Sequence, residues 1–235
     1  MSSADWTELT GGLAIASVDR GVTNGVPRAN GGGNFLFGFN SLVVVTGAVG
    51  FFTNQVNFAP MAKGGSVRGA IKRLPSGGPL GFSPVLFIGL QGTSVGDIGY
   101  MLGLGNSDPY HIVLKKGVFG TELQDLAPDA PANGVLMRSA GTYDNDTWHH
   151  LRLDMIVNAN GDVLLQCFEN NLAAHALGTA PVWTPIVGME NFVDDALQIN
   201  SGSAPLTTGR AGFGFWTNDV TRRSAVDHVE VYRQL

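Results

Sequence analysis

Histidine and carboxylate side chains meet in the segment WHHLRLD, which runs from Trp148 to Asp154. A histidine beside an acidic residue supplies two members of a serine-hydrolase triad, but the triad also needs a serine placed to attack the substrate. The chain contains no G-x-S-x-G turn that would place one. We therefore expect no triad chemistry from His149, His150 and Asp154. Neighbouring residues of a strand point to opposite faces, so we predict that His150 is an exposed or edge residue and that His149 is partly buried.

Oxygen-bearing side chains precede this segment in TYDNDTW. Asp144, Asn145 and Asp146 would supply part of the six to eight oxygens that Ca²⁺ takes in proteins. The D-x-D-x-D-G order of an EF-hand loop is absent, and clusters of Asp and Asn are ordinary turn formers. We expect no cofactor, and these three residues are the calcium candidates if a metal binds.

Composition and charge exclude several classes of partner. The net charge is −5, and no run of Lys or Arg is longer than two residues, so we expect no nucleic-acid ligand. The glycine-rich run PRANGGGN (27–34) lacks the pattern of a P-loop or a dinucleotide loop and is interpreted as a flexible arm or bend. No apolar stretch reaches the roughly 20 residues of a membrane helix, and the start MSSADWTELTGG has no signal-peptide character. We therefore expect cytosolic synthesis and no membrane insertion.

The elements that must position these residues are mainly strands. The chain has 33 glycines, many in turn-like runs such as KGGS (63–66) and PSGGPLG (75–81), with short stretches of β-branched and aromatic residues between them. This spacing is typical of a sandwich or barrel of short strands. We predict strands at 13–18, 35–45, 48–53, 66–73, 84–91, 98–104, 110–116, 134–140, 148–157, 163–169, 210–217 and 226–233. A single helix is predicted at 189–199, where Phe192, Ala196 and Ile199 recur at helical spacing.

The segment from Trp148 to Asn170 is predicted to be a hairpin with a definite register. A three-residue loop ANG (159–161), with Gly161 in the left-handed conformation, joins its two strands. One face then pairs only apolar residues: Val157 with Val163, Met155 with Leu165, and Leu153 with Cys167. The other face is mixed: Ile156 with Leu164, Asp154 with Gln166, Arg152 with Phe168, and His150 with Asn170. Cys167, the only cysteine, is predicted to be a buried small hydrophobe.

The last predicted strand alternates in the same way. In SAVDHVEVYRQL, residues Asp227, Val229 and Val231 share one face, and His228, Glu230 and Tyr232 share the other. We expect the segment GRAGFGFWTND (209–219) to be its neighbour.

The order of these motifs resembles a known superfamily. G-x-x-G-F-G-F is followed about ten residues later by V-D-H-V-E-V, and W-H-H-L-R-L-D and N-G-D-V lie upstream. This order resembles the concanavalin A-like, laminin-G-like jelly rolls over roughly residues 60–235. The resemblance implies an all-β fold with two antiparallel sheets packed face to face, one of them concave. We predict a Gly-rich N-terminal arm (1–34), packed on the domain or on a neighbour, and a single sandwich domain (35–235).

The glycoside hydrolases of that superfamily carry E-x-D-x-x-E or E-x-D-x-E on one strand. This pattern puts two carboxylates on one face, and a retaining reaction needs them about 5.5 Å apart. Five glutamates were compared with the pattern and none begins it: Glu8, Glu122, Glu169, Glu190 and Glu230. We therefore predict no enzymatic activity, and glycoside hydrolysis is the least favoured hypothesis.

Five side chains are candidate contacts for a ligand or partner. Arg152 beside Phe168 predicts a cation–π pair on the mixed face, where His150 and Gln166 also lie. Trp183 stands between two prolines in the long segment 170–189, where it would either pin that segment to the sandwich or stack on a sugar ring; pinning is favoured.

Two functional hypotheses take up these features. The absent signal peptide, the Gly-rich arm and the low charge, 14% of residues, resemble accessory virion proteins of tailed bacteriophages. The first hypothesis is accordingly a non-enzymatic virion component, such as a decoration, neck or tail accessory protein, that assembles with other virion proteins or with itself as a homo-oligomer. The alternative is a lectin-like, carbohydrate-binding module that recognises glycans on a host surface.

Overall fold

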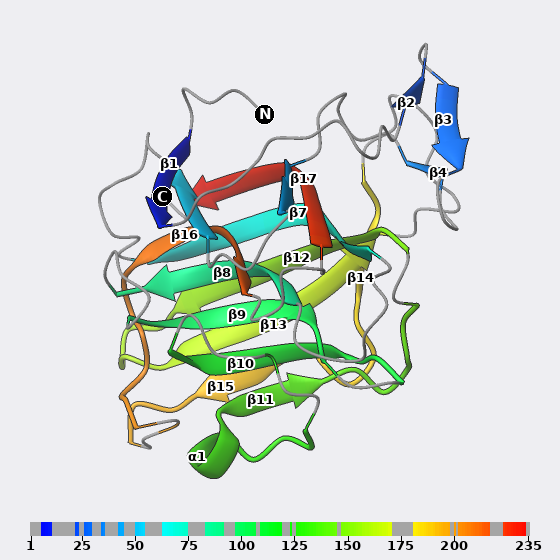
Figure 1. Ribbon diagram of the computed structural model, residues 1–235. Coiled ribbons are helices and arrows are strands. Elements are labelled where there is room, and N and C mark those ends of the chain that lie inside the picture. Colours follow the sequence, from blue (N-terminus) through cyan, green and yellow to red (C-terminus); the bar gives the residue numbers. More distant parts are fainter. Residues whose placement is uncertain are drawn as a thin grey trace.

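Two antiparallel β-sheets stack on one another in the computed structural model (Figure 1). The structure describes residues 6–10, 22–23, 26–29, 34–35, 42–44, 50–54, 63–74, 83–91, 97–106, 109–118, 123, 126–144, 147–170, 181–197, 200, 202–216 and 223–233. In these residues one short helix is found, α1 (Ala130–Asn133), and no helix is long and apolar enough to cross a membrane. The predicted all-β class is confirmed.

The first sheet has the strand order β1-β6-β16-β8-β9-β10-β11, and every neighbouring pair is antiparallel. Its strands are β1 (Trp6–Thr10), β6 (Gly50–Asn54), β8 (Ser83–Leu90), β9 (Ile98–Leu104), β10 (Ile112–Val118), β11 (Val135–Arg138) and β16 (Arg210–Trp216).

The second sheet has the order β14-β13-β12-β7-β17-β5, and β15 also pairs with β13. Its strands are β5 (Leu42–Val44), β7 (Gly64–Leu74), β12 (His149–Val157), β13 (Val163–Asn170), β14 (Trp183–Pro185), β15 (Phe192–Asp194) and β17 (Arg223–Arg233). A small third sheet contains β2 (Val22–Thr23), β3 (Val26–Ala29) and β4 (Asn34–Phe35).

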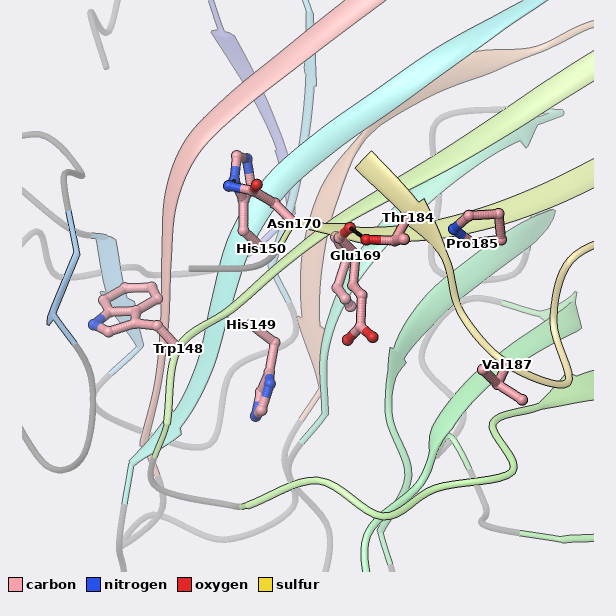
Figure 2. A pocket seen from close by; sticks show the side chains of 9 residues that line it. Trp148, His149, His150, Glu169, Asn170, Thr184, Pro185 and Val187 are labelled. Atoms are coloured by element: carbon pink, nitrogen blue, oxygen red, sulfur yellow. Dashed lines mark hydrogen bonds between the residues drawn. The ribbon is translucent and has the colours of Figure 1, made fainter. Parts of the chain in front are cut away.

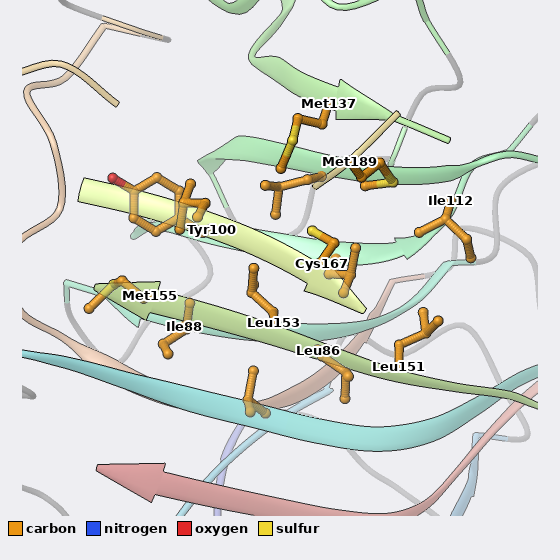
Figure 3. Packing of buried hydrophobic residues seen from close by; sticks show 14 of the residues in the cluster. Leu86, Ile88, Tyr100, Ile112, Met137, Leu151, Leu153, Met155, Cys167 and Met189 are labelled. Atoms are coloured by element: carbon orange, nitrogen blue, oxygen red, sulfur yellow. The ribbon is translucent and has the colours of Figure 1, made fainter. Parts of the chain in front are cut away.

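The main hydrophobic core lies between the two large sheets, because each strand turns every second side chain inward. Leu153 of β12 and Cys167 of β13 are fully buried there, in one cluster with Leu86 of β8 and Tyr100 of β9 (Figure 3). Burial raises the pKa of the Cys167 thiol well above its usual value, so the thiol is protonated at neutral pH. The prediction that Cys167 is a buried hydrophobe is confirmed.

The hairpin of β12 and β13 has the predicted register. Val157 pairs with Val163, and the pairing continues through Leu153 with Cys167 to Arg152 with Phe168. Gly161 has φ of 92°, and its N–H donates to the Asn158 carbonyl at 3.0 Å, as a left-handed residue closing a three-residue loop should. The alternating apolar pattern and the turn therefore determine this register together.

The neighbour predicted for the last strand is wrong. β17 pairs with β7 and β5, whereas β16 pairs with β8 and β6 in the other sheet. Alternation in a sequence says which side chains share a face but not which strand lies alongside. Here Arg68 of β7 lies directly opposite Glu230, and this cross-strand ion pair favours the β7 partner.

The predicted helix at 189–199 is also wrong. Residues Phe192–Asp194 form β15, with Phe192 opposite Leu165 of β13. The strand is favoured because pairing satisfies the backbone along the free edge of β13 and carries the Asp194 side chain into the core, where it is fully buried. Directly after the strand, the Asp195 carboxylate accepts from the Leu197 N–H at 2.7 Å, which forms a local turn instead of a helix. Ile199 lies outside the described residues.

A buried ion pair ties the two sheets together. Lys116 of β10 donates to Asp194 of β15 at 2.7 Å, and both side chains are 0% exposed. The same ammonium donates to the carbonyls of Ser203 and Ala204, both at 2.8 Å. Asp194 in turn accepts from the Tyr100 hydroxyl and the Asn200 amide, both at 2.6 Å. The ammonium nitrogen and both carboxylate oxygens thus have partners within the protein.

Most of residues 1–34 lies outside the described residues, including the predicted strand at 13–18 and the glycines of the expected arm. Within this range β1 pairs with β6. The predicted division into an arm (1–34) and a domain (35–235) stays a prediction.

Candidate functional site

Two parallel rows of side chains cross the outer face of the second sheet. The register of four adjacent strands, β13, β12, β7 and β17, aligns Phe168, Arg152, Arg68 and Glu230 as directly opposite pairs. Two residues further along each strand, on the same face, the second row is Gln166, Asp154, Ser66 and Tyr232. We call these eight residues together with Trp183 of β14 the arginine face.

Aromatic rings and guanidinium groups alternate on the arginine face. The Arg152 guanidinium lies 4.2 Å from the ring centre of Phe168 and 5.5 Å from that of Trp183. The Arg68 guanidinium lies 5.9 Å from Trp183 and 4.7 Å from Tyr232. Each distance is within the range of a cation–π contact. The stacking holds both guanidinium planes in fixed orientations beside aromatic surfaces.

Both arginines are also paired with carboxylates. Arg152 donates through Nε and Nη2 to the two oxygens of Asp154, at 2.9 and 2.6 Å. Arg68 donates through Nε to Glu230 at 2.7 Å and through Nη2 to Glu230 and to the Tyr232 hydroxyl. The two positive and two negative charges of the face cancel. Neither Nη1 group has a hydrogen-bond partner among the described residues, so both keep donors available.

A pocket of about 300 Å³ opens on this face, lined by Ser66, Arg68, Arg152, Asp154 and Tyr232. The Ser66 hydroxyl is buried and has no hydrogen-bond partner in the described part of the chain. Desolvation and the hydrogen bond to Glu230 raise the pKa of Tyr232, so its hydroxyl is protonated at neutral pH. The pocket therefore offers fixed donors, a carboxylate and an exposed aromatic ring.

The structure brings four of the five predicted contact residues, Arg152, Phe168, Gln166 and Trp183, onto the arginine face. Gln166 lies at the end of the second row, where its amide donates to the Asn191 side chain at 2.8 Å. Trp183 is half-buried and packs against His150, with ring centres 4.7 Å apart, so it contacts the sheet as a pinning residue would and also borders the arginine face. Whether these residues bind a ligand stays a prediction.

The prediction that His150 is exposed is wrong. Its side chain is only 4% exposed, because Trp183 covers it and the Asn170 amide lies 3.2 Å from its Nδ1. His149 is half-buried, as expected.

The calcium candidates are only partly described. Asp144 is exposed, and its carbonyl accepts from His149 at 2.8 Å and from Thr147 at 3.2 Å. Asn145 and Asp146 lie outside the described residues. Among the residues with described positions, no three His, Cys, Asp or Glu side chains are grouped to hold a metal ion.

Sequence reasoning missed four of the nine residues of the arginine face as candidates, namely Ser66, Arg68, Glu230 and Tyr232. The alternation of the last strand did predict that Glu230 and Tyr232 share a face. No local signal places that face beside Arg152, because the pairing of β7 with β12 and β17 joins distant parts of the chain.

A second pocket, of about 410 Å³, lies where β12, β13 and β14 meet. Figure 2 shows that His150 and Asn170 lie together on one side of this strand pair, whereas His149 and Glu169 point to the other side. Glu169 and the core residue Leu151 are directly opposite each other in the ladder. We call this cavity the Glu169 pocket.

No protein-family model and no curated protein matches the chain. Solved structures do match its fold. The carbohydrate recognition domain of Emp46p in its metal-free form aligns with 99% of this chain and 89% of its own, at 11% identity and a TM-score of 0.50. A protein of unknown function, SO2946 from Shewanella oneidensis MR-1, aligns with 99% of this chain and 80% of its own, at 10% identity and a TM-score of 0.51. At these identities the similarity concerns the fold alone, and it confirms the predicted lectin-like jelly roll.

Proposed function

We propose that this protein is a non-enzymatic, lectin-like module that binds carbohydrate at the arginine face. The observation that carries the proposal is the pocket in which open guanidinium donors lie beside aromatic rings. A sugar ring presents apolar C–H surfaces above and below and hydroxyl groups around its edge. Aromatic faces suit the first and oriented polar groups suit the second.

Charge balance indicates which sugars fit. Arg68 and Arg152 are already neutralised by Glu230 and Asp154, so an acidic sugar would gain little from the arginines and would be repelled by the carboxylates. A neutral sugar can accept bonds from the open Nη1 donors and donate to the second lone pairs of Asp154. Neutral sugars are accordingly the proposed ligand class.

The hydrogen bonds of Asp154 and Glu230 agree with sugar binding without hydrolysis. A glycosidase needs one carboxylic acid that carries a proton and a second carboxylate free to act as nucleophile or base. Asp154 accepts two hydrogen bonds from Arg152, and Glu230 accepts from Arg68 and Tyr232. Both carboxylates are therefore already engaged by an arginine of the same face.

Similarity of fold to the Emp46p carbohydrate recognition domain adds support by analogy only. The first hypothesis from the sequence, a component of a bacteriophage virion, stays a prediction.

The test is a screen of the whole chain on an array of neutral and acidic glycans, followed by calorimetric titration of the best ligand. We expect Arg152→Ala and Trp183→Ala each to weaken binding at least tenfold, about 1.4 kcal/mol. Arg138→Ala, a half-buried arginine on the opposite sheet, is the matched control and should change binding less than twofold. Urea unfolding of each variant checks that the fold is intact.

The proposal fails if no glycan binds, or if the two variants bind as tightly as the native chain. Release of new reducing ends from a bound glycan would contradict the non-enzymatic part.

A further inference from the structure

The Glu169 pocket contains a carboxylate that has no basic partner among the described residues. The Tyr143 hydroxyl donates to its Oε2 atom at 3.0 Å. Among the described residues no Lys, Arg or His lies within ion-pair distance of Glu169. By contrast, Asp154, Asp194 and Glu230 each have a basic partner. The ten residues 171–180, which follow β13, contain no Lys or Arg and one histidine, His175.

The polar neighbours of Glu169 do not supply the missing charge. Desolvation, followed by the proximity of Glu169, raises the pKa of Tyr143, so the hydroxyl stays neutral. Burial lowers the pKa of His149, which is therefore neutral at pH 7. The Asp144 carbonyl can only accept, so the proton of neutral His149 is on Nε2, and Nδ1 carries a lone pair. The pocket thus contains one negative charge and a neutral acceptor.

The walls are suited to an organic ligand. Trp148 is 3% exposed, and Val187 borders the same cavity beside the Thr184 hydroxyl. Pro185, directly opposite Phe168, borders the cavity from the other side of the strands. Tyr143 lies edge-on to His149, with ring centres 5.3 Å apart, next to the carboxylate. An apolar stem would lie along these walls while a cationic head meets Glu169, and nearby aromatic rings stabilise such a head further.

We propose that the Glu169 pocket binds a primary ammonium group. Three groups that border the pocket can accept from the N–H donors of an ammonium: the Glu169 carboxylate, His149 Nδ1 and the Thr184 hydroxyl. The Thr184 hydroxyl gives its own proton to the Glu169 carbonyl at 3.5 Å, which leaves its lone pairs to accept. The carboxylate of this site lies apart from the arginine face, since Glu169 and His149 point away from the face on which Arg152 lies. The inference does not depend on the proposed function.

Two other cations fit less well. A guanidinium binds best when it uses both oxygens of a carboxylate, but Oε2 of Glu169 already accepts from Tyr143. Calcium takes six to eight oxygens, and this pocket has a single carboxylate. The ammonium group belongs either to an amino sugar or to a lysine side chain, and the probes below distinguish these sources.

The test is calorimetric titration of the whole native chain with matched probe pairs. Glucosamine is compared with glucose, and Nα-acetyl-lysine amide with the uncharged Nα-acetyl-norleucine amide. We expect at least one charged probe to bind at least tenfold more tightly than its uncharged partner, and the pair that shows this identifies the source. Because this comparison uses the native chain, it is decisive even if a variant fails to fold.

Variants locate the binding. Glu169→Gln should weaken binding of the charged probe at least tenfold. Glu190→Gln removes the same charge from an exposed position nearby and should change binding less than twofold. Arg152→Ala should leave ammonium binding unchanged, so failure at this pocket and failure at the arginine face can be told apart.

Three results would overturn the inference: neither charged probe binds more tightly than its uncharged partner, Glu169→Gln binds the charged probe as the native chain does, or methylguanidine binds more tightly than the amines.

Discussion

Ion pairs occur in two regions of this molecule, and their surroundings differ. Lys116 and Asp194 are fully buried between the sheets, and the Lys116 ammonium and both Asp194 oxygens have partners. On the arginine face the side chains of Arg68 and Arg152 are 23% and 25% exposed, and the Nη1 group of each has no partner in the part of the chain that the structure describes. A buried donor left open would cost about 1–3 kcal/mol, whereas an exposed one is satisfied by water. The core pair therefore serves the fold, and the surface pairs remain able to bind a ligand.

Replacing Lys116 should show the largest effect of this difference. In Lys116→Met the Asp194 carboxylate stays buried without its cation, and the carbonyls of Ser203 and Ala204 lose their donor. Breaking a buried pair in this way costs about 3–5 kcal/mol of unfolding free energy. The measurement is the urea unfolding curve. Lys115→Met, on the half-buried neighbour, is the control and should cost less than about 1 kcal/mol.

Equal losses for Lys116→Met and Lys115→Met would mean that the buried pair contributes no more to stability than a surface charge, and the contrast between the two regions would disappear.

The sequence predicted those parts of this contrast that depend on local pattern. The hairpin register placed Arg152 opposite Phe168 and Asp154 opposite Gln166, because the turn at Gly161 and the apolar alternation lie within one short segment. Arg68 and Glu230, by contrast, meet across 162 residues of sequence. Strand alternation carries no information on such pairing, so four of the nine residues of the arginine face could not be placed there from the sequence.

Contacts with residues distant in the sequence explain why the predictions for His150 and for residues 189–199 were wrong. His150 lies on the face that alternation assigns to it, but the Trp183 ring covers it from another strand. Residues 189–199 show helical spacing, yet Phe192–Asp194 form a strand. Pairing with the edge of β13 and the buried ion pair of Asp194 with Lys116 favour this conformation. In both cases a tertiary contact outweighed the local signal.

The half-buried His149 should have an intermediate effect on the free energy of unfolding. Burial lowers the pKa of His149 below its ordinary value of 6.5. Between the lowered pKa and 6.5 the unfolded chain binds a proton that the folded chain does not, so the free energy of unfolding falls as pH falls through this window. We expect this loss to be smaller in His149→Gln, whose amide can still donate to the Asp144 carbonyl.

The measurement is urea unfolding of both proteins at pH 7.5 and pH 5.0. If the two proteins lose the same free energy of unfolding between these pH values, His149 does not titrate as the structure indicates.

The smallest effect is expected where the charges are most exposed. Arg68 and Glu230 form an ion pair on the arginine face, and the Glu230 side chain is 37% exposed. A double-mutant cycle with Arg68→Ala, Glu230→Ala and the combined variant should give a coupling of about 0.2–1 kcal/mol in unfolding free energy. Both single variants should nevertheless weaken binding of any glycan held by the face, because Glu230 orients Arg68 and Arg68 borders the pocket. A coupling above about 2 kcal/mol would mean that this pair supports the fold as the Lys116 pair does, and the open donor of Arg68 would lose its value as a sign of binding.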